Sequence, residues 1–311
     1  ITVTQYLVVY LSIRGKIVAT LIRPNKLLYR MLRPSARWVR RYVHPQSWLG
    51  GKLCSPFGVE ITRSTYSGIP GVKFSPKIRT EQKAIIVFFH GGGYCFGSSL
   101  TTHRLGVALM AKHTGLTCHS IDYRLAPEHP YPAALDDALT AWQGIVDSHP
   151  NHKIILSGDS AGGGLSLAVM MRLQAEGGRL PDDAILFSPW TDLTCQGDSY
   201  ATKARVDPMF TPSMPRDCSH YYAPKETDKT NPFVSPAFGN FTGLPRMLIL
   251  CGGNEILLSD SKKLAEGAKS AGVDVELAIW DNMFHDWWLF GLFIPETKQC
   301  LTKVSAWLKG N

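Results

Sequence analysis

The sequence lacks the cysteine patterns of a disulfide-rich or zinc-binding protein. Seven cysteines are scattered over 311 residues, with no CxxC pair and no Cys/His ligand spacing. An odd number of cysteines without a repeated spacing argues against a disulfide framework and against a zinc site. We therefore expect reduced, partly buried thiols and no bound metal, which is typical of a cytoplasmic enzyme.

A long apolar run is also missing. The chain opens with ITVTQYLVVYLSI, where Thr, Gln and Ser interrupt a stretch that is too short to span a bilayer. Nothing like an A-x-A cleavage site follows it. Because the chain starts at Ile1 rather than Met, the sequence leaves open whether a targeting segment precedes it.

Acidic residues are absent from residues 1–41. That segment holds nine basic residues: Arg14, Lys16, Arg23, Lys26, Arg30, Arg33, Arg37, Arg40 and Arg41. The whole chain has 33 Lys and Arg, so the remainder carries 33 − 9 = 24 of them against all 25 acidic residues. The net charge of +8 therefore belongs to the N-terminal segment alone, and we expect no nucleic-acid partner.

Six of these cations recur at spacings of three and four, from Arg23 to Arg40, which places them along one helical face. Pro24 is expected to start a helix, and Pro34 to divide the segment into two. Two interpretations remain open. The face is either a basic amphipathic surface for anionic membranes or the solvated side of two ordinary helices.

Strand and helix patterns alternate from residue 84 onward, with no internal repeat. The expected strands lie at 84–89, 116–121, 153–157, 184–188, 246–250 and 273–280. The expected helices lie at about 102–113, 132–148, 160–176, 260–271 and 296–309. The strands are continuously apolar, as parallel strands covered on both faces are, whereas residues 59–66 alternate like an edge strand. The sequence predicts an α/β fold with a mostly parallel central sheet flanked by helices.

Two regions do not fit this alternation, namely residues 1–45 and residues 191–240. The second is rich in Pro, Tyr, Asp and Lys and follows a strand, at the end of the sheet where α/β proteins bind ligands. We expect 1–45 and 191–240 to form a helical cap over a catalytic domain made of 46–190 and 241–311.

The segment GDSAGGG at 158–164 joins an expected strand directly to an expected helix. Its first five residues match G-x-S-x-G, the sharp strand-to-helix turn that presents a nucleophilic serine, here Ser160. Gly158 and Gly162 would be required because a side chain at either position would clash with neighbouring backbone. The alternative is a glycine-rich helix start with a serine cap.

The segment HGGGY at 90–94 ends another buried strand. Consecutive glycines let backbone N–H groups approach a ligand, and acyl transfer needs such donors for the developing oxyanion. We assign the N–H groups of Gly91, Gly92 and Ala161 to an oxyanion hole. A phosphate-binding loop is the alternative, but no G-K-[ST] or G-x-G-x-x-G follows. His90 is expected to hold the loop in shape.

Together with DYRLAPEHPYPAALDD (122–137), these two motifs resemble the hormone-sensitive-lipase-like branch of the α/β-hydrolases, the bacterial family IV esterases. The resemblance covers roughly residues 55–309. It implies the α/β-hydrolase fold with a cap, a serine carboxylesterase activity, and no metal or organic cofactor.

In this fold the order along the chain is serine, acid, histidine. Of ten histidines only His220 and His285 follow Ser160, and His220 lies in the expected cap. His285 lies between the last expected strand and the last expected helix, and its segment matches the histidine loop of the family. We predict His285 to be the base that takes the proton of Ser160.

The acid is predicted to be Glu255, which follows the strand at 246–250 in the segment CGGNEILLSD. The resemblance supports this choice, because most members carry Asp at that position, and the fold uses either acid. Asp260 is the alternative, but a role as helix cap or first-turn anion suffices for it. Asp281 and Asp286 flank His285 and are expected to be poor partners for it.

The predicted reaction is hydrolysis of short-to-medium acyl esters through an acyl-Ser160 intermediate, with a small-molecule ester as the partner. The same residues would serve an amidase, a formamidase or a lipase. A non-catalytic receptor is disfavoured because serine, acid and histidine are all present. The strand at 273–280 is expected at a sheet edge, where a homodimer could form.

Overall fold

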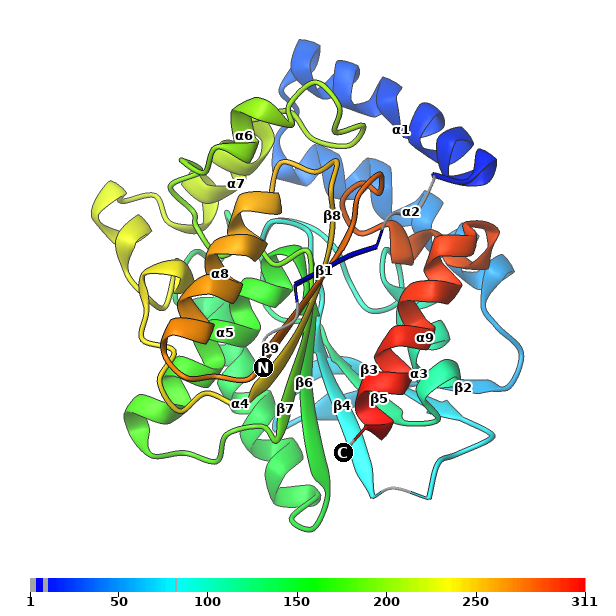
Figure 1. Cartoon of the computed structure of the whole chain (residues 1–311), viewed down its shortest axis with the longest axis vertical. Coiled ribbons are helices and arrows are strands. Elements are labelled where there is room, and N and C mark those ends of the chain that lie inside the picture. The colour runs from blue at the N-terminus through cyan, green and yellow to red at the C-terminus, as the bar shows by residue number, and fades with distance from the viewer. Residues whose placement is uncertain (1–3, 8–10, 82, 311) are drawn as a thin grey trace.

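One sheet runs through the molecule, seen nearly edge-on in Figure 1. The computed structural model describes residues 4–7, 11–81 and 83–310. Within them the sheet has nine strands in the order β1-β9-β8-β7-β6-β4-β5-β3-β2. The strands are β1 (Thr4–Leu7), β2 (Val59–Tyr66), β3 (Ile69–Pro76), β4 (Ala84–Phe89), β5 (Thr117–Ile121), β6 (Lys153–Asp159), β7 (Asp183–Phe187), β8 (Arg246–Gly252) and β9 (Val275–Trp280).

All pairings from β1 to β5 in that order are parallel, and β3 is antiparallel to both of its neighbours. The six buried strands lie where the apolar runs predicted them, and β2 is an edge strand as expected. The sequence did not predict β3, because Pro70, Gly71 and Pro76 disfavour a strand. Gly71 is needed there, since a Cβ would lie 2.4 Å from the Ser120 carbonyl oxygen.

Helices cover both faces of the sheet. They are α1 (Ile13–Leu32), α2 (Ala36–Cys54), α3 (Arg104–Thr114), α4 (Ala133–Ser148), α5 (Ser160–Glu176), α6 (Ser199–Thr202), α7 (Ser213–Tyr222), α8 (Leu258–Ser270) and α9 (Pro295–Lys309). Three short 3₁₀ helices lie at Glu226–Thr230, Pro236–Phe238 and Trp287–Phe293. In Figure 1, α4, α5 and α8 lie on one face of the sheet and α3 and α9 on the other.

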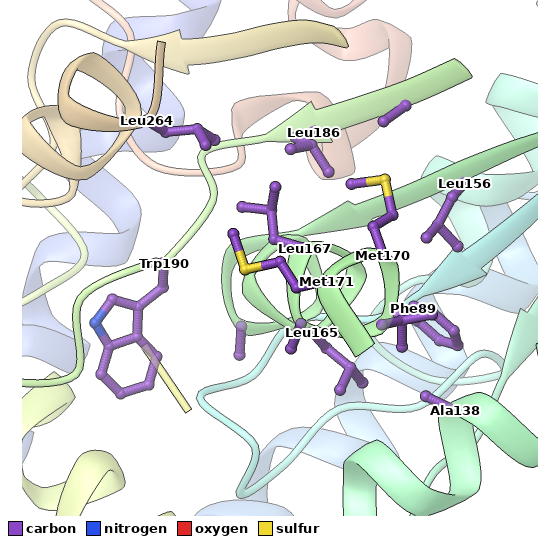
Figure 2. Close-up of a cluster of buried hydrophobic side chains, with 14 of the residues drawn as sticks. Phe89, Ala138, Leu156, Leu165, Leu167, Met170, Met171, Leu186, Trp190 and Leu264 are labelled. Atoms are coloured by element: carbon purple, nitrogen blue, oxygen red, sulfur yellow. The ribbon is translucent and has the colours of Figure 1, made fainter. Parts of the chain in front are cut away.

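The core on the α5 face explains why the first three turns of this helix carry no charged residue. Every residue from Ser160 to Met171 is buried. Figure 2 shows α5 side chains, including Leu165 and Met170, beside the strand residues Phe89 and Leu186. Burying one such side chain is worth about 1.5–3 kcal/mol, so this layer fixes α5, and with it Ser160, against the sheet.

The N-terminal segment forms two helices that break at Pro34, as predicted. Two details of the prediction are wrong. The first helix starts at Ile13, capped by Ser12, so that Pro24 lies inside it. The second helix continues to Cys54, so the boundary expected after residue 45 falls within α2.

Both helices lie with α6 and α7 over one end of the sheet (Figure 1). Lys26 Nζ of α1 donates to the carbonyl oxygens of Ala204 and Asp207, at 2.6 Å each. Arg40 of α2 donates to the carbonyl oxygens of Cys95 and Ala126, also at 2.6 Å. The N-terminal helices are therefore anchored to the loops that follow strands β4 and β7.

The far edge of the sheet differs from the expectation. β1 pairs in parallel with β9, from Thr4 opposite Leu277 to Leu7 opposite Trp280. β9 therefore has neighbours on both sides, and the expectation that it is a free edge available to a second chain is wrong. A homodimer formed in another way stays a prediction. A search of the described helices for a bilayer-spanning segment found no candidate.

Candidate active site

Ser160 lies at the junction of β6 and α5 with a backbone φ of +50°, a conformation that costs energy for any residue but glycine. The two flanking glycines are required, as predicted. A Cβ on Gly158 would lie 2.4 Å from the Gly162 carbonyl oxygen, and one on Gly162 would lie 2.0 Å from the Phe89 carbonyl oxygen. The turn is therefore strained and closely packed, as the motif requires.

The glycine loop after β4 has positive φ at three successive residues, Gly92 (+108°), Gly93 (+59°) and Tyr94 (+61°). The N–H of Gly91 donates to Asp159 Oδ1 at 2.9 Å. Its assignment as an oxyanion donor is therefore wrong for this structure, because the N–H is already used. In the part of the chain that the structure describes, no hydrogen bond occupies the N–H of Gly92 or Gly93.

His90 holds this loop. Its Nδ1 lies 2.7 Å from the Gly91 carbonyl oxygen, and its ring stacks on Tyr123 with the centroids 4.4 Å apart. The Tyr123 hydroxyl donates to the His90 carbonyl oxygen at 2.6 Å. Burial, with a smaller effect of His103, lowers the pKa of His90 to about 4, so the ring is neutral near neutral pH.

A buried ion pair lies directly behind the nucleophile. His103 Nε2 is 2.9 Å from Asp159 Oδ2, and His103 Nδ1 is 2.7 Å from Thr102 Oγ1. Burial alone would lower the pKa of His103, but Asp159 outweighs it and raises the pKa. Our interpretation of the sequence missed this pair because the two residues are 56 positions apart. Asp159, inside the G-D-S-A-G motif, was the one feature of the sequence that could have indicated this pair.

The predicted base and acid lie together, and both are buried. His285 lies in the loop after β9, and its Nδ1 is 3.5 Å from Glu255 Oε1. Glu255 Oε2 is fixed by the hydroxyl of Ser188 at 2.8 Å and by the N–H of Gly252 at 3.0 Å. Burial would lower the pKa of His285, but Asp286 and Glu255 outweigh it and raise the pKa well above its ordinary value.

Asp260 lies in the first turn of α8, but its side chain caps no helix. Its Oδ1 accepts the backbone N–H groups of Thr191 and Asp192, at 3.0 and 2.9 Å. The helix starts at Leu258, two residues before the expected start. Asp260 therefore fixes the loop after β7. The expectation of a helix cap is wrong, and the alternative expectation of an acid in the first turn is confirmed. Burial raises its pKa to about 7.

Asp286 was expected to be a poor partner of His285, and that expectation is also wrong. Its Oδ2 lies 2.9 Å from His285 Nε2, the nitrogen that a nucleophilic serine would use. Asp286 has a left-handed backbone, with φ +50° and ψ 37°, which turns its side chain back towards the preceding residue. Burial, opposed by His285, raises the pKa of Asp286 to about 7.

The remaining expected positions are distributed as follows. His220 is exposed on α7, where it lies beside Tyr221. Among the described residues, Ser160 and His285 form no hydrogen bond with each other. His285 Nε2 is paired with Asp286 instead. No cluster of His, Cys, Asp and Glu suited to a metal ion occurs in the described ranges. The described geometry pairs a buried acid with a buried base and holds a serine in a strained turn.

Comparison with known proteins gives the same family. The model of the α/β-hydrolase fold family matches residues 86–289. An acetyl-hydrolase from Streptomyces hygroscopicus is 37% identical over 226 residues, which are 72% of this chain and 75% of that protein. An esterase from Acinetobacter venetianus is 34% identical over 248 residues, 79% of this chain and 81% of that protein.

Among solved structures, an esterase of the bacterial hormone-sensitive lipase family superposes with a TM-score of 0.88. It is 31% identical, and the match covers 97% of this chain and 99% of that one. The chain therefore belongs to the α/β-hydrolase family and, within it, to the carboxylesterases related to hormone-sensitive lipase.

Proposed function

We propose that Ser160, His285 and Glu255 form the catalytic triad of this carboxylesterase. The observation that supports this most strongly is the pairing of two buried groups, His285 and Glu255, at 3.5 Å near a serine held at φ +50°. Glu255 stabilises the imidazolium and fixes the tautomer that leaves Nε2 free to accept a proton.

Before chemistry begins, His285 Nε2 exchanges its bond with Asp286 for a bond with Ser160 Oγ. The base then takes the hydroxyl proton while Oγ attacks the ester carbonyl carbon, and the imidazolium returns that proton to the leaving alkoxide. Water repeats the sequence on the acyl-enzyme. His285 takes a proton from the water, whose oxygen attacks the acyl carbon, and Ser160 leaves with that proton as the free acid is released.

The oxyanion donors are the N–H groups of Gly92, Gly93 and Ala161. Gly92 and Gly93 follow the occupied N–H of Gly91 and adopt positive φ, and among the described residues neither of their N–H groups donates to the protein. Ala161 lies in the first turn of α5, where N–H groups have no partner within the helix. Removing one such donor from a related site costs roughly 2.7–4 kcal/mol of barrier.

Helices α1 and α2, together with residues 191–240, serve as the cap, which sets the acyl preference. Phe210 lies over His285, with the ring centroids 4.7 Å apart, and Cys218 lies against Gly93. These side chains close the site from above and favour short-to-medium acyl groups, in keeping with the acetyl-hydrolase relative. A rate series over acyl length on soluble esters tests this, and a maximum with long-chain emulsified substrates would contradict it.

We place the enzyme in the cytoplasm. All seven cysteines are free thiols, and five of them are buried. Burial raises the pKa of Cys195 to about 12, and that of the deeper Cys118, Cys251 and Cys300 still further, which keeps these sulfurs as unreactive thiols. Fractionation of cells that express the natural gene tests this placement, and recovery of the enzyme in an extracytoplasmic fraction would contradict it.

We also propose that α1 contacts anionic membrane surfaces. Its exposed large apolar side chains are Ile13, Ile17, Leu21, Leu27, Leu28, Met31 and Leu32. Basic residues lie between them and the helix contains no acid, a pattern that suits an anionic lipid surface. Co-sedimentation with phosphatidylglycerol vesicles, and its loss in neutral phosphatidylcholine vesicles, is the expected result. Equal or absent sedimentation with both would contradict the proposal.

A further inference from the structure

A cleft of about 630 Å³ lies between α1 and the segment 204–213. Its charged lining residues are Arg23, Lys26, Arg30, Arg205 and Asp207. Leu27, Ala204 and Pro212 add an apolar wall. A cleft of this kind suits a ligand that has both a hydrocarbon portion and a charged group.

The cleft carries a net positive charge that no other group of its lining neutralises. Asp207 is its only carboxylate, and that group is buried and already bonded. Its Oδ1 accepts the N–H groups of Met209 and Phe210, and its Oδ2 accepts that of Ile256. Burial lowers the pKa of Lys26, and the neighbouring Arg23 and Arg30 lower it further against the effect of Asp207.

Three of the cations have no protein partner. Within the ranges that the structure describes, no hydrogen bond or ion pair is made by the guanidinium groups of Arg23, Arg30 and Arg205. Farther along the N-terminal helices the situation is different, because Arg37 and Arg40 both pair with Glu128. Arg23, Arg30 and Arg205 thus lie around one cleft and leave planar donors open to an oxyanion.

The N-terminus of helix α7 also contributes to the positive potential of the cleft. Helix α7, ten residues long, begins at Ser213, and both Ser213 and Pro212 line the cleft. The N–H of Met214 donates to the Thr211 carbonyl oxygen, and Pro215 has no N–H. This helix end therefore adds its dipole and the N–H of Ser213 to the three arginines, which carry most of the positive charge.

The segment 204–213, which forms one wall of the cleft, also contacts the catalytic residues. Phe210 packs on the ring of His285. Asp207 bonds the N–H of Ile256, the residue that follows Glu255. The segment that forms one wall of the cleft thus also contacts the base and the loop of the acid.

We propose that this cleft binds an anionic group of the substrate, so that the enzyme prefers esters that carry a carboxylate or a similar oxyanion remote from the scissile bond. The proposal rests on the proposed esterase function and names a substrate class for it. The hydrocarbon between the charge and the ester would lie along Leu27 and Pro212, with the anion at the arginines.

The test compares kcat/KM for matched esters that differ only in a terminal carboxylate. One pair is 4-nitrophenyl hexanoate and mono-4-nitrophenyl adipate, with the charge on the acyl side. The other is pentyl butyrate and 4-carboxybutyl butyrate, with the charge on the alcohol side. We expect the charged ester of at least one pair to be preferred about tenfold at low salt. The preference should shrink between 50 and 500 mM NaCl, because salt of about 0.1 M screens charges beyond about 10 Å.

The variant Arg23→Gln/Arg30→Gln/Arg205→Gln should reduce the ratio of charged to neutral kcat/KM about tenfold. Arg63→Gln, an exposed arginine on the edge strand β2, is the matched control and should leave the ratio unchanged. No preference in either pair, or a preference that the triple variant retains, would overturn the proposal. Loss of vesicle binding in the triple variant with an unchanged ratio would also overturn it and assign the cleft to lipid.

The two hypotheses fail in different ways. If the wild-type enzyme hydrolyses neither the neutral nor the charged esters, the proposed function itself fails. If it hydrolyses the neutral esters and shows no preference for the charged ones, only the anion cleft fails.

Discussion

Asp286 controls the pH range in which His285 can act as a base, and replacing it by Asn should shift that range. The carboxylate lies 2.9 Å from His285 Nε2, and both groups are buried. An imidazolium cannot accept the proton of Ser160, so kcat/KM rises only as the pH exceeds the pKa of His285. Removing the negative charge lowers that pKa and moves the acid limb of the profile to lower pH.

The size of the shift follows from the distance. Two unit charges about 4 Å apart interact by about 4 kcal/mol at an effective dielectric constant of about 20, and one pKa unit corresponds to about 1.4 kcal/mol. Asp286 itself has a pKa of about 7, so it is only partly charged on the acid limb, and the Asn oxygen still accepts a hydrogen bond. We therefore expect a shift of about one pH unit, which means roughly tenfold higher kcat/KM at a pH on that limb.

The assay is kcat/KM for a soluble short-chain ester from pH 5 to 9, for wild type and Asp286→Asn. Asp281→Asn is the matched control, because Asp281 is also in this loop, whereas the ion pairs of His285 among the described residues are with Glu255 and Asp286. The reasoning would be refuted if the acid limb of the kcat/KM profile stays in place or moves to higher pH in a folded Asp286→Asn protein. Near-ultraviolet circular dichroism verifies the fold of each variant.

Three further predictions concern stability and the choice of acid. Glu255→Ala should lose about 10⁴-fold in kcat while Asp260→Asn retains most activity; the reverse order in folded proteins would assign the acid to Asp260. The pKa of Asp260 is raised from 3.8 to about 7, so the folded state alone keeps the proton in between, and wild type should lose stability as the pH rises from 3.8 to about 7. Asp260→Asn should flatten that dependence by about 1–3 kcal/mol in urea unfolding, and an unchanged slope would count against it. Gly162→Ala should lower the unfolding free energy by about 3 kcal/mol or more, because a Cβ would lie 2.0 Å from the Phe89 carbonyl oxygen. Gly50→Ala, which meets nothing within 4 Å, is its control in thermal unfolding and should cause no loss.

The parts of the fold that depend on local patterns could be predicted from the sequence. The buried parallel strands are runs of apolar residues. The nucleophile turn needs glycine at fixed positions, at Gly158 because of a clash within the turn itself and at Gly162 because of the neighbouring strand β4. The strand β3, which lies between β5 and β2, was missed because its prolines and glycine contradict strand propensity, and pairing with both neighbours stabilises it.

The parts of the site that depend on tertiary contacts could not be predicted in this way. Gly91 resembles its neighbours in sequence, and only the approach of Asp159 uses its N–H. The bond between Asp286 and His285 depends on a left-handed backbone at a residue that is not glycine, which no local pattern indicated. Asp260 was expected to cap a helix, but folding brings the loop at Thr191 within its reach.

The central claim is that Ser160 is the nucleophile of a serine esterase, and fluorophosphonate labelling followed by peptide mapping tests it most directly. We predict a single modified peptide that contains Ser160, loss of labelling in Ser160→Ala, and loss of ester hydrolysis in step with labelling. Labelling at another residue, or full ester hydrolysis by a protein that carries no label, would contradict the account.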